Sequence, residues 1–133
     1  MTAMPEPQRP SRRRILVVDD EPDICEALDV FLSSEGYQVS TVESGAAAIE
    51  QVKRQAFDLV ITDLRMPGMS GVEAVASLKR LHPDLAVIVV SGYVSDESDL
   101  RCRAEGVATI IRKPFHLDDL LNVIARALGA AHA

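Results

Sequence analysis

The 133-residue sequence contains no tryptophan, two tyrosines, three phenylalanines and two cysteines. The cysteines, Cys25 and Cys102, fall in separate predicted helices without metal-ligand spacing, which indicates reduced structural thiols in a cytosolic protein. His82, His116 and His132 are scattered along the chain and do not indicate a metal site. No segment approaches the ~20 consecutive apolar residues of a membrane span, and no apolar core follows the basic N-terminus as in a secretory signal. We therefore expect a cytoplasmic protein without membrane contact.

The net charge of −6 is unevenly spread. Residues 1–14 hold four of the fourteen basic side chains and one of the twenty acidic ones, so that the remaining chain carries a net charge of −9. An acidic body of this kind disfavours direct nucleic-acid binding. Residues 1–12 contain three prolines among polar residues, which predicts a disordered basic leader. A nucleic-acid or membrane patch is the alternative for this arm, and a solvated leader is the preferred interpretation.

The chain length predicts one domain with a substantial core. Four apolar runs are continuous rather than alternating, which is typical of strands in a parallel sheet covered on both faces. They span residues 15–18, 59–62, 86–90 and 108–111. A fifth run, residues 37–41, is more polar, as expected for an edge strand.

Helical segments separate these runs at residues 22–35, 45–54, 71–81, 96–105 and 117–128. Their limits carry helix-terminal signals: Asp20 or Glu21 as cap before Pro22, Ser44, a Ser70–Glu73 capping-box pattern, and the glycines Gly36, Gly106 and Gly129. Strand and helix therefore alternate five times. This order predicts an α/β three-layer sandwich over residues 13–129, followed by a short tail at 130–133.

Polar residues follow the strands at the ends where a parallel sheet binds its ligands. Asp19 and Asp20 follow the run 15–18, and Asp63 follows the run 59–62. Ser91 comes after the run 86–90, and Lys113 after the run 108–111. Each has an ordinary alternative reading: Asp20 as a helix cap, Ser91 as a turn residue and Lys113 as a loop lysine. Their joint occurrence at one edge of the sheet favours a functional site.

Three carboxylates in so small a region repel one another unless one is protonated or a cation is bound. Hard oxygen ligands of this kind are suited to Mg²⁺. A lysine and a hydroxyl beside them are suited to a phosphoryl group. The combination predicts a phosphoryl-transfer site with Asp63 as the acceptor.

These residues lie in the motifs "ILVVDDEP", "DLVITDLRMPGMSG", "VIVVSGY" and "IIRKPF". In this order and spacing the chain resembles, over about residues 13–129, the receiver domain of two-component response regulators, the CheY-like superfamily. The resemblance implies a flavodoxin-like (βα)5 fold with a five-stranded parallel sheet of order 2-1-3-4-5. It also implies that Asp63 is phosphorylated and that Mg²⁺ is bound by Asp19, Asp20, Asp63 and the backbone carbonyl of Arg65.

The resemblance further implies that Ser91 and Lys113 bind the phosphoryl group and that the Lys113–Pro114 peptide is cis. The partner implied is a sensor histidine kinase or phosphotransfer protein, whose phosphohistidine donates the phosphoryl group. The downstream effector stays open, as does the choice between a single-domain regulator and a receiver belonging to a longer protein. The chain would be a signalling switch that catalyses only its own phosphorylation and dephosphorylation.

The chain departs from the family in its switch residues. The family has an aromatic residue three positions before the lysine, where this chain has Ile110. Because a β-branched side chain is stiff at χ1, we expect Tyr93, in the loop after Gly92, to change environment instead. The segment 96–105 has Leu100 as its one large aliphatic residue, which predicts a helix weakly held to the sheet. On modification, Ser91 is expected to move toward Asp63 and to displace this loop.

Two other classes of protein share parts of the pattern. A hydrolase with an aspartyl-phosphate intermediate, of the haloacid-dehalogenase type, keeps an acidic residue two positions after the nucleophile, where this chain has Arg65. A degenerate receiver that serves only for docking would lack Asp20, Asp63 or Lys113, and all three are present. The sequence therefore favours a phosphorylation-controlled switch.

Overall fold

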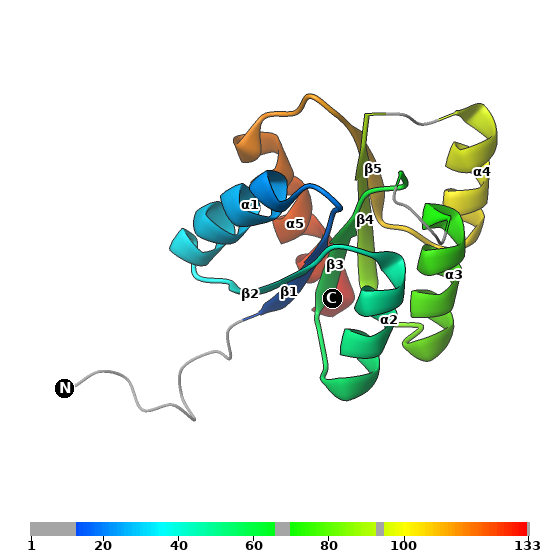
Figure 1. Ribbon diagram of the computed structural model, residues 1–133, viewed down its shortest axis with the longest axis horizontal. Helices are drawn as coiled ribbons and strands as arrows, with labels where there is room; N and C mark the ends of the chain where they lie inside the picture. The colour runs from blue at the N-terminus through cyan, green and yellow to red at the C-terminus, as the bar shows by residue number, and fades with distance from the viewer. Residues whose placement is uncertain (1–12, 66–69, 93–94, 133) are drawn as a thin grey trace.

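A computed structural model describes residues 13–65, 70–92 and 95–132 of the chain (Figure 1). The elements, in chain order, are β1 (Arg14–Val18), α1 (Pro22–Ser34), β2 (Gln38–Val42), α2 (Gly45–Arg54), β3 (Leu59–Thr62), α3 (Gly71–Leu81), β4 (Ala86–Ser91), α4 (Asp96–Ala104), β5 (Thr109–Arg112) and α5 (Leu117–His132). The five strands are parallel and lie in the order β2-β1-β3-β4-β5. This confirms the predicted fold class and strand order.

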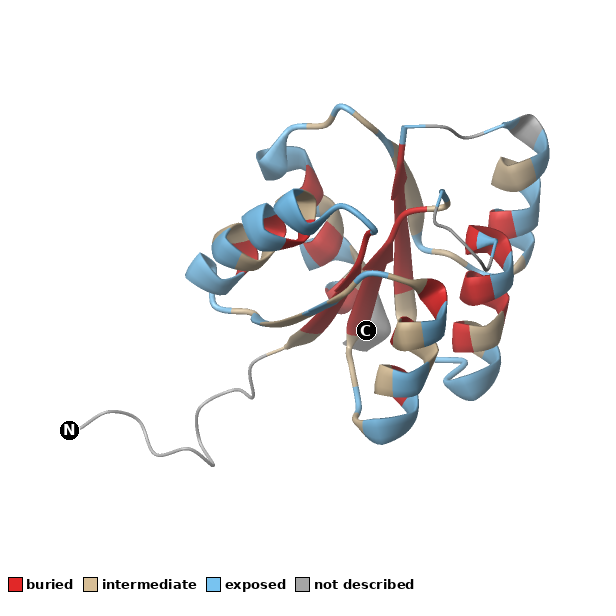
Figure 2. Ribbon diagram, in the orientation of Figure 1, coloured by how far each residue is buried: buried red, intermediate tan, exposed pale blue. Residues whose placement is uncertain are grey.

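The sheet lies between two helical layers, with α1 and α5 on one face and α2, α3 and α4 on the other (Figure 1). Alternate residues of each central strand enter two separate core clusters. In β1, Ile15 and Val17 pack in the cluster with α1 and α5, whereas Leu16 and Val18 pack in the cluster with α2 and α3. The buried strands form the centre of Figure 2. Burial on both faces is the physical reason for the continuous apolar runs.

The predicted start of α1 is partly wrong. Glu21 is the N-cap residue, but neither it nor Asp20 caps the helix through its side chain; Pro22 opens the helix as expected. Asp19 Oδ1 instead accepts a hydrogen bond from the Glu21 N–H at 3.0 Å. The end of the helix agrees with the prediction, because Gly36 has a φ of 99°, in the region that favours glycine.

Serine side chains begin the next three helices. Ser44 accepts a hydrogen bond from Ala47 N–H, and Ser70 accepts one from Glu73 N–H, as the sequence predicts. At α4 the capping box is complete and is formed by Ser95 and Ser98, which the sequence reading did not identify. The reciprocal bonds of that box fix the start of α4 directly after the fourth strand and its loop.

The predicted end of α5 is wrong, and the large aliphatic residue of α4 is not its buried contact. Helix α5 does not end at Gly129 but continues to His132, since a glycine in a helix weakens it without ending it. In α4, Leu100 does not pack on the sheet: it is 70% exposed, whereas Cys102 is fully buried in the cluster with α2 and α3. The small thiol therefore attaches this polar helix.

Within the described ranges, no helix has the length and apolar character needed to cross a membrane. The predicted leader, residues 1–12, and the switch residue Tyr93 lie outside the described part of the chain.

The continuous α5 gives a direct test of the C-terminal structure. Gly129→Ala is expected to raise the free energy of unfolding by several tenths of a kcal/mol, up to about 1, because alanine is the better helix former. A β-carbon at this position meets nothing within 4 Å. Urea unfolding followed by circular dichroism measures the effect. A loss of stability would show that the helix does not extend through residue 129.

Candidate functional site

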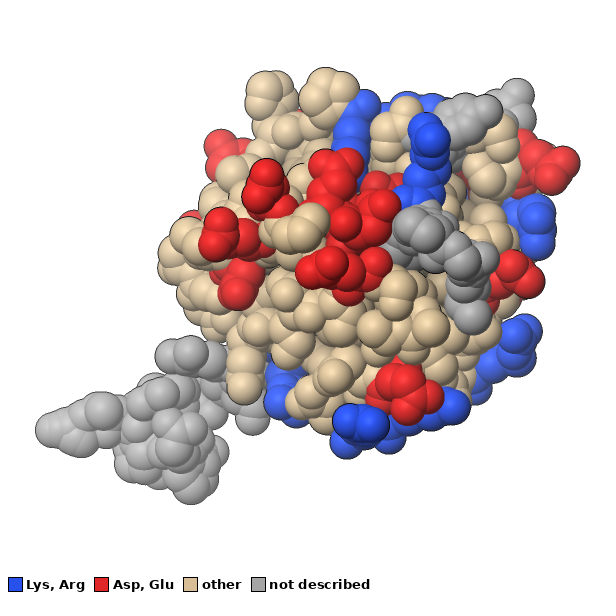
Figure 3. All heavy atoms as spheres, viewed as in Figure 1, with Lys and Arg blue, Asp and Glu red and all other residues tan. Residues whose placement is uncertain are grey.

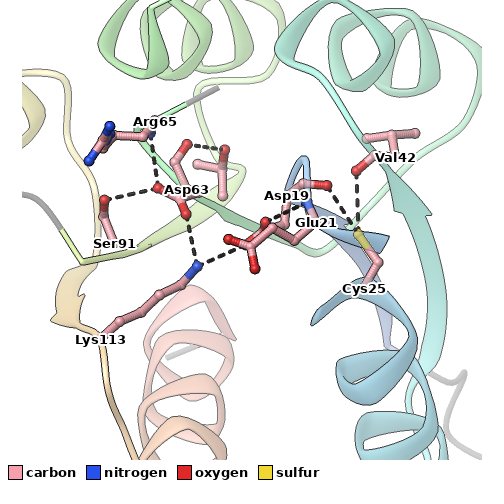
Figure 4. Close-up of polar contacts among 9 residues, drawn as sticks. Asp19, Glu21, Cys25, Val42, Asp63, Arg65, Ser91 and Lys113 are labelled. Carbon is pink, nitrogen blue, oxygen red and sulfur yellow. Dashed lines mark hydrogen bonds and ion pairs between the residues drawn. The ribbon is translucent and has the colours of Figure 1, made fainter. Parts of the chain in front are cut away.

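The candidate site lies at the carboxyl ends of the four strands β1, β3, β4 and β5 (Figure 4). Val18 and Thr62 are paired in register, so that the residues that follow them, Asp19 and Asp63, emerge side by side. The backbone hydrogen bonds continue one residue past each strand: Asp63 N–H donates to Val18 O at 3.1 Å, and Lys113 N–H donates to Ser91 O at 3.0 Å. The sheet thus fixes the positions of the site residues through their backbone.

Asp63 is held by donors from three directions. Its Oδ1 accepts hydrogen bonds from the Arg65 N–H and the Ser91 hydroxyl, each at 2.9 Å, and its Oδ2 lies 2.9 Å from Lys113 Nζ. The residue is 7% exposed, and burial by itself raises the pKa of its carboxyl group. The hydrogen bonds from Arg65, Lys113 and Ser91 outweigh burial, so that the pKa is lowered and the group is ionised at neutral pH.

Lys113 bridges two carboxylates. Its Nζ lies 3.0 Å from Asp19 Oδ2 and 2.9 Å from Asp63 Oδ2. Burial acts to lower the pKa of the ammonium group, but its hydrogen bonds to Asp63 and Asp19 raise the pKa above the ordinary lysine value. The sequence led us to expect a metal ion as the cation that offsets carboxylate repulsion here. In the structure the lysine already supplies that charge.

A second acidic group lies beside this ion-pair network. Asp19, Asp20 and Glu21 each place one carboxylate oxygen within 4.8 Å of the others. Asp19 is buried and the other two are exposed, and acidic side chains gather on this face in Figure 3. Glu21 adds a carboxylate that the predicted site did not include. Its position after the acidic pair could have indicated it, but the sequence assigned it to the helix cap. These hard oxygen donors fit Mg²⁺.

Cys25 is a neighbour of the site that the sequence reading did not identify. Its thiol donates to the carbonyl of Asp19 at 3.3 Å and lies 3.7 Å from that of Val42 (Figure 4). Burial, together with the nearby charge of Asp19, raises the pKa of this thiol. The protonated thiol thus satisfies the buried carbonyl of the peptide that joins Asp19 to Asp20.

The remaining predicted residues lie around the network. The Lys113–Pro114 peptide is cis, as expected. A β-carbon added to Gly92 would contact Lys113 Cβ at 3.7 Å, so Gly92 itself lies against the lysine. Ile110 is half-buried and packs on the core cluster beneath α3 and α4. Ser91 already donates to the unmodified Asp63, and its movement on modification stays a prediction.

Residues 15–125 match the family model of the response regulator receiver domain. The chain therefore belongs to this family. Receiver domains act in two-component signalling, where they are switches controlled by phosphorylation, and their partners are histidine kinases or phosphotransfer proteins.

Named relatives agree with this assignment. The transcriptional regulatory protein ZraR of Escherichia coli (strain K12) is 36% identical over 119 residues, which are 90% of this chain and 27% of that protein. The response regulator receiver protein CpdR of Brucella abortus (strain 2308) is 34% identical over 119 residues, which are 90% of this chain and 99% of that protein. The structure of TrrA from Thermotoga maritima with Mg²⁺ and beryllofluoride superposes with a TM-score of 0.79 at 36% identity, covering 86% of this chain and 98% of that one.

The acidic group gives a prediction about cation binding. Asp20→Asn is expected to weaken Mg²⁺ binding by roughly tenfold or more, since even the loss of an outer-shell partner costs roughly 10–100-fold. Without Mg²⁺ the variant should melt no lower than wild type, because one of several close negative charges is gone. Titration of Mg²⁺ followed by amide shifts and by melting temperature measures both effects.

Glu26→Gln is the matched control for Asp20→Asn, because Glu26 is an exposed acid on α1 that is not part of the acidic group. It should leave the Mg²⁺ affinity at the wild-type value. Equal affinities for all three proteins would remove Asp20 from the cation site.

Proposed function

We propose that the chain accepts a phosphoryl group on Asp63 from the phosphohistidine of a sensor histidine kinase or phosphotransfer protein. The observation that supports this most directly is the state of the Asp63 side chain. It is buried and ionised, and it is surrounded by the Arg65 N–H, the Ser91 hydroxyl and the Lys113 ammonium group. A carboxylate kept anionic beside donors for phosphoryl oxygens is equipped as a nucleophile for phosphoryl transfer.

In the transfer, one carboxylate oxygen of Asp63 attacks the phosphorus atom in line with the bond to the histidine nitrogen. The O–P bond forms as the P–N bond breaks, and the electron pair returns to the imidazole, which leaves neutral because its other nitrogen carries a proton. Lys113 and Ser91 then donate to oxygens of the transferred group, since both already lie 2.9 Å from the carboxylate. Attack of water on the resulting acyl phosphate restores Asp63 and releases inorganic phosphate.

A Mg²⁺ site is assigned to this edge of the sheet, with Asp19, Asp20, Asp63 and the carbonyl of Arg65 as ligands, as the family resemblance implies. Asp19 and Asp20 belong to the acidic group, whose third member is Glu21. Bound Mg²⁺ would offset the charge of the phosphoryl oxygens during transfer. The fit rests on the chemistry of the donors: hard oxygens, with exposed Asp20 and Glu21 leaving room for water ligands. The similarity to TrrA, whose structure contains Mg²⁺ and beryllofluoride, supports the same assignment.

The donor's docking surface is assigned to a groove beside Lys113. The groove has a volume of about 510 Å³ and is largely apolar. It is lined by Asp23, Ile24, Ala27 and Leu28 of α1 and by Lys113, Pro114, Phe115 and Leu117 of the β5–α5 segment. Because Lys113 reaches Asp63 from this same segment, a helix that carries the phosphohistidine could bury its apolar face here and present the ring to the acceptor.

The hydrolase alternative receives no support from the site. Such an enzyme needs a general acid close to the nucleophile, and Arg65, two residues after Asp63, contributes its backbone N–H to the carboxylate. The chain is thus assigned as a switch that catalyses only its own phosphorylation and dephosphorylation. Its cytoplasmic location stays a prediction, and its downstream effector stays open.

Phosphorylation at Asp63 is tested with acetyl phosphate and Mg²⁺. Intact-mass analysis should show one acid-labile phosphoryl group on the wild-type chain and none on Asp63→Asn, because the amide is not a nucleophile. Asp84→Asn, in an exposed loop, serves as control and should be modified like wild type. A stoichiometric adduct on Asp63→Asn would refute the assignment of the acceptor.

The docking groove is tested separately from the chemistry. Ala27→Arg places a long charged side chain on an exposed position of the groove and should slow phosphotransfer from an autophosphorylated histidine kinase by about tenfold or more, as expected for a charge buried in an apolar contact. Modification by acetyl phosphate should keep its wild-type rate. The kinase used is the one, from a purified panel, that phosphorylates wild type fastest.

Ala46→Arg introduces the same charge at an exposed position on α2, away from the groove, and should not affect either reaction. Wild-type transfer rates for Ala27→Arg would move the docking surface to another face.

A further inference from the structure

Gly71, the first residue of α3, contacts the backbone beside the acceptor. A β-carbon at this position would lie 2.4 Å from Leu64 Cα, 2.6 Å from Leu64 O and 2.8 Å from Leu64 C. Real β-carbons essentially never come within 3.0 Å of such atoms. Gly71 is not among the described glycines with positive φ, which are Gly36 and Gly106. Its lack of a side chain is therefore required by this close approach and not by its backbone conformation.

The peptide that joins Leu64 to Arg65 connects Gly71 to the acceptor. Its carbonyl, Leu64 O, accepts a hydrogen bond from Gly71 N–H at 3.3 Å. Its N–H, on Arg65, donates to Asp63 Oδ1 at 2.9 Å. Because a peptide is planar, the carbonyl and the N–H cannot be reoriented independently. The contact of the Leu64 carbonyl with Gly71 thus sets the direction in which the Arg65 N–H points toward Asp63.

We propose that Gly71 is a positioning residue for phosphorylation: it holds the Leu64–Arg65 peptide in the orientation that keeps the Arg65 N–H on the Asp63 carboxylate. This proposal rests on the proposed function of Asp63. It extends that function by adding a residue of α3 that touches neither the acceptor nor the phosphoryl group.

Core packing determines whether α3 or the Leu64–Arg65 peptide moves when a β-carbon is added to Gly71. The beginning of α3 is anchored by Val72, Val75 and Leu78, all buried in the core cluster with α2, so a retreat of the helix would open a cavity. Leu64 packs against the same cluster but is only half-buried, and it begins the loop after Asp63. The peptide is therefore the part that moves, and its rotation takes the Arg65 N–H away from Asp63. Retreat of α3 would also release the peptide, by breaking the bond from Gly71 N–H to Leu64 O.

The test compares Gly71→Ala with Gly129→Ala in the full chain. Both replace a helical glycine by alanine, but the control position has nothing within 4 Å of the added carbon. In Mg²⁺-free buffer, Gly71→Ala should shift the Arg65 amide resonance and reduce its hydrogen-exchange protection, whereas Gly129→Ala should leave both unchanged. With acetyl phosphate and Mg²⁺, Gly71→Ala should be modified about tenfold or more slowly, since losing one preorganised donor costs about 10²–10³ in rate and a displaced donor costs less.

The outcomes separate this proposal from the proposed function. If wild type is not modified on Asp63, the proposed function fails, and the Arg65 amide in Gly71→Ala still reports on the peptide. A folded Gly71→Ala with the wild-type Arg65 resonance and the wild-type rate overturns the positioning role. Should that variant not fold, native-state hydrogen exchange of wild type decides: the Gly71 and Arg65 amides should open with one common free energy, and separate opening overturns the proposal.

Discussion

The Lys113 ammonium group between Asp19 and Asp63 is the interaction on which the site depends. Two ionised carboxylates at the ends of neighbouring strands destabilise the fold unless a positive charge lies between them. Lys113 supplies that charge from β5, the far edge of the sheet, and reaches the carboxylates past β4. The strand order and the hydrogen bond from Lys113 N–H to Ser91 O place this ammonium group between the two carboxylates.

Backbone geometry explains why this arrangement is rigid. The backbone N–H groups of Asp19, Asp63 and Lys113 each donate to the last residue of a neighbouring strand. The sheet therefore positions these three residues without the help of a loop. Loops enter only at the next residues, where Arg65 N–H and Glu21 N–H turn back to bind the carboxylates that precede them by two positions. The sheet therefore fixes the backbone positions of the site residues. The donors that lower the pKa of Asp63 come from the ends of strands, as Ser91 and Lys113 do, and from a loop, as Arg65 does.

The sequence predicts the parts of the structure that depend on local patterns. Continuous apolar runs indicated strands buried on both faces, and the polar residues after them indicated the site. The errors concern features set by tertiary contacts. The sequence does not show which apolar residue of α4 is buried: Leu100, its one large aliphatic, is exposed, and the smaller Cys102 is fully buried. Gly129 was expected to end α5, yet the helix continues past it. Cys25 is a buried structural thiol, as predicted, but its contact with the Asp19 carbonyl was not foreseen because it requires the turn of the chain between β1 and α1.

The way α4 is attached suggests where a change at Asp63 is transmitted. Phosphorylation adds negative charge and three acceptor oxygens at the carboxylate, so the hydrogen bonds of Ser91 and Lys113 have to be redistributed. Ser91 ends β4 and Lys113 follows β5, and the segment between these strands contains α4. On the opposite face, α1 and α5 contribute several large buried residues to the core, including Leu28, Leu32, Leu120 and Ile124. Because α4 has a small thiol as its fully buried apolar anchor, displacing it costs less apolar burial than displacing α1 or α5. We therefore expect a redistribution of charge at the site to be relieved toward α4.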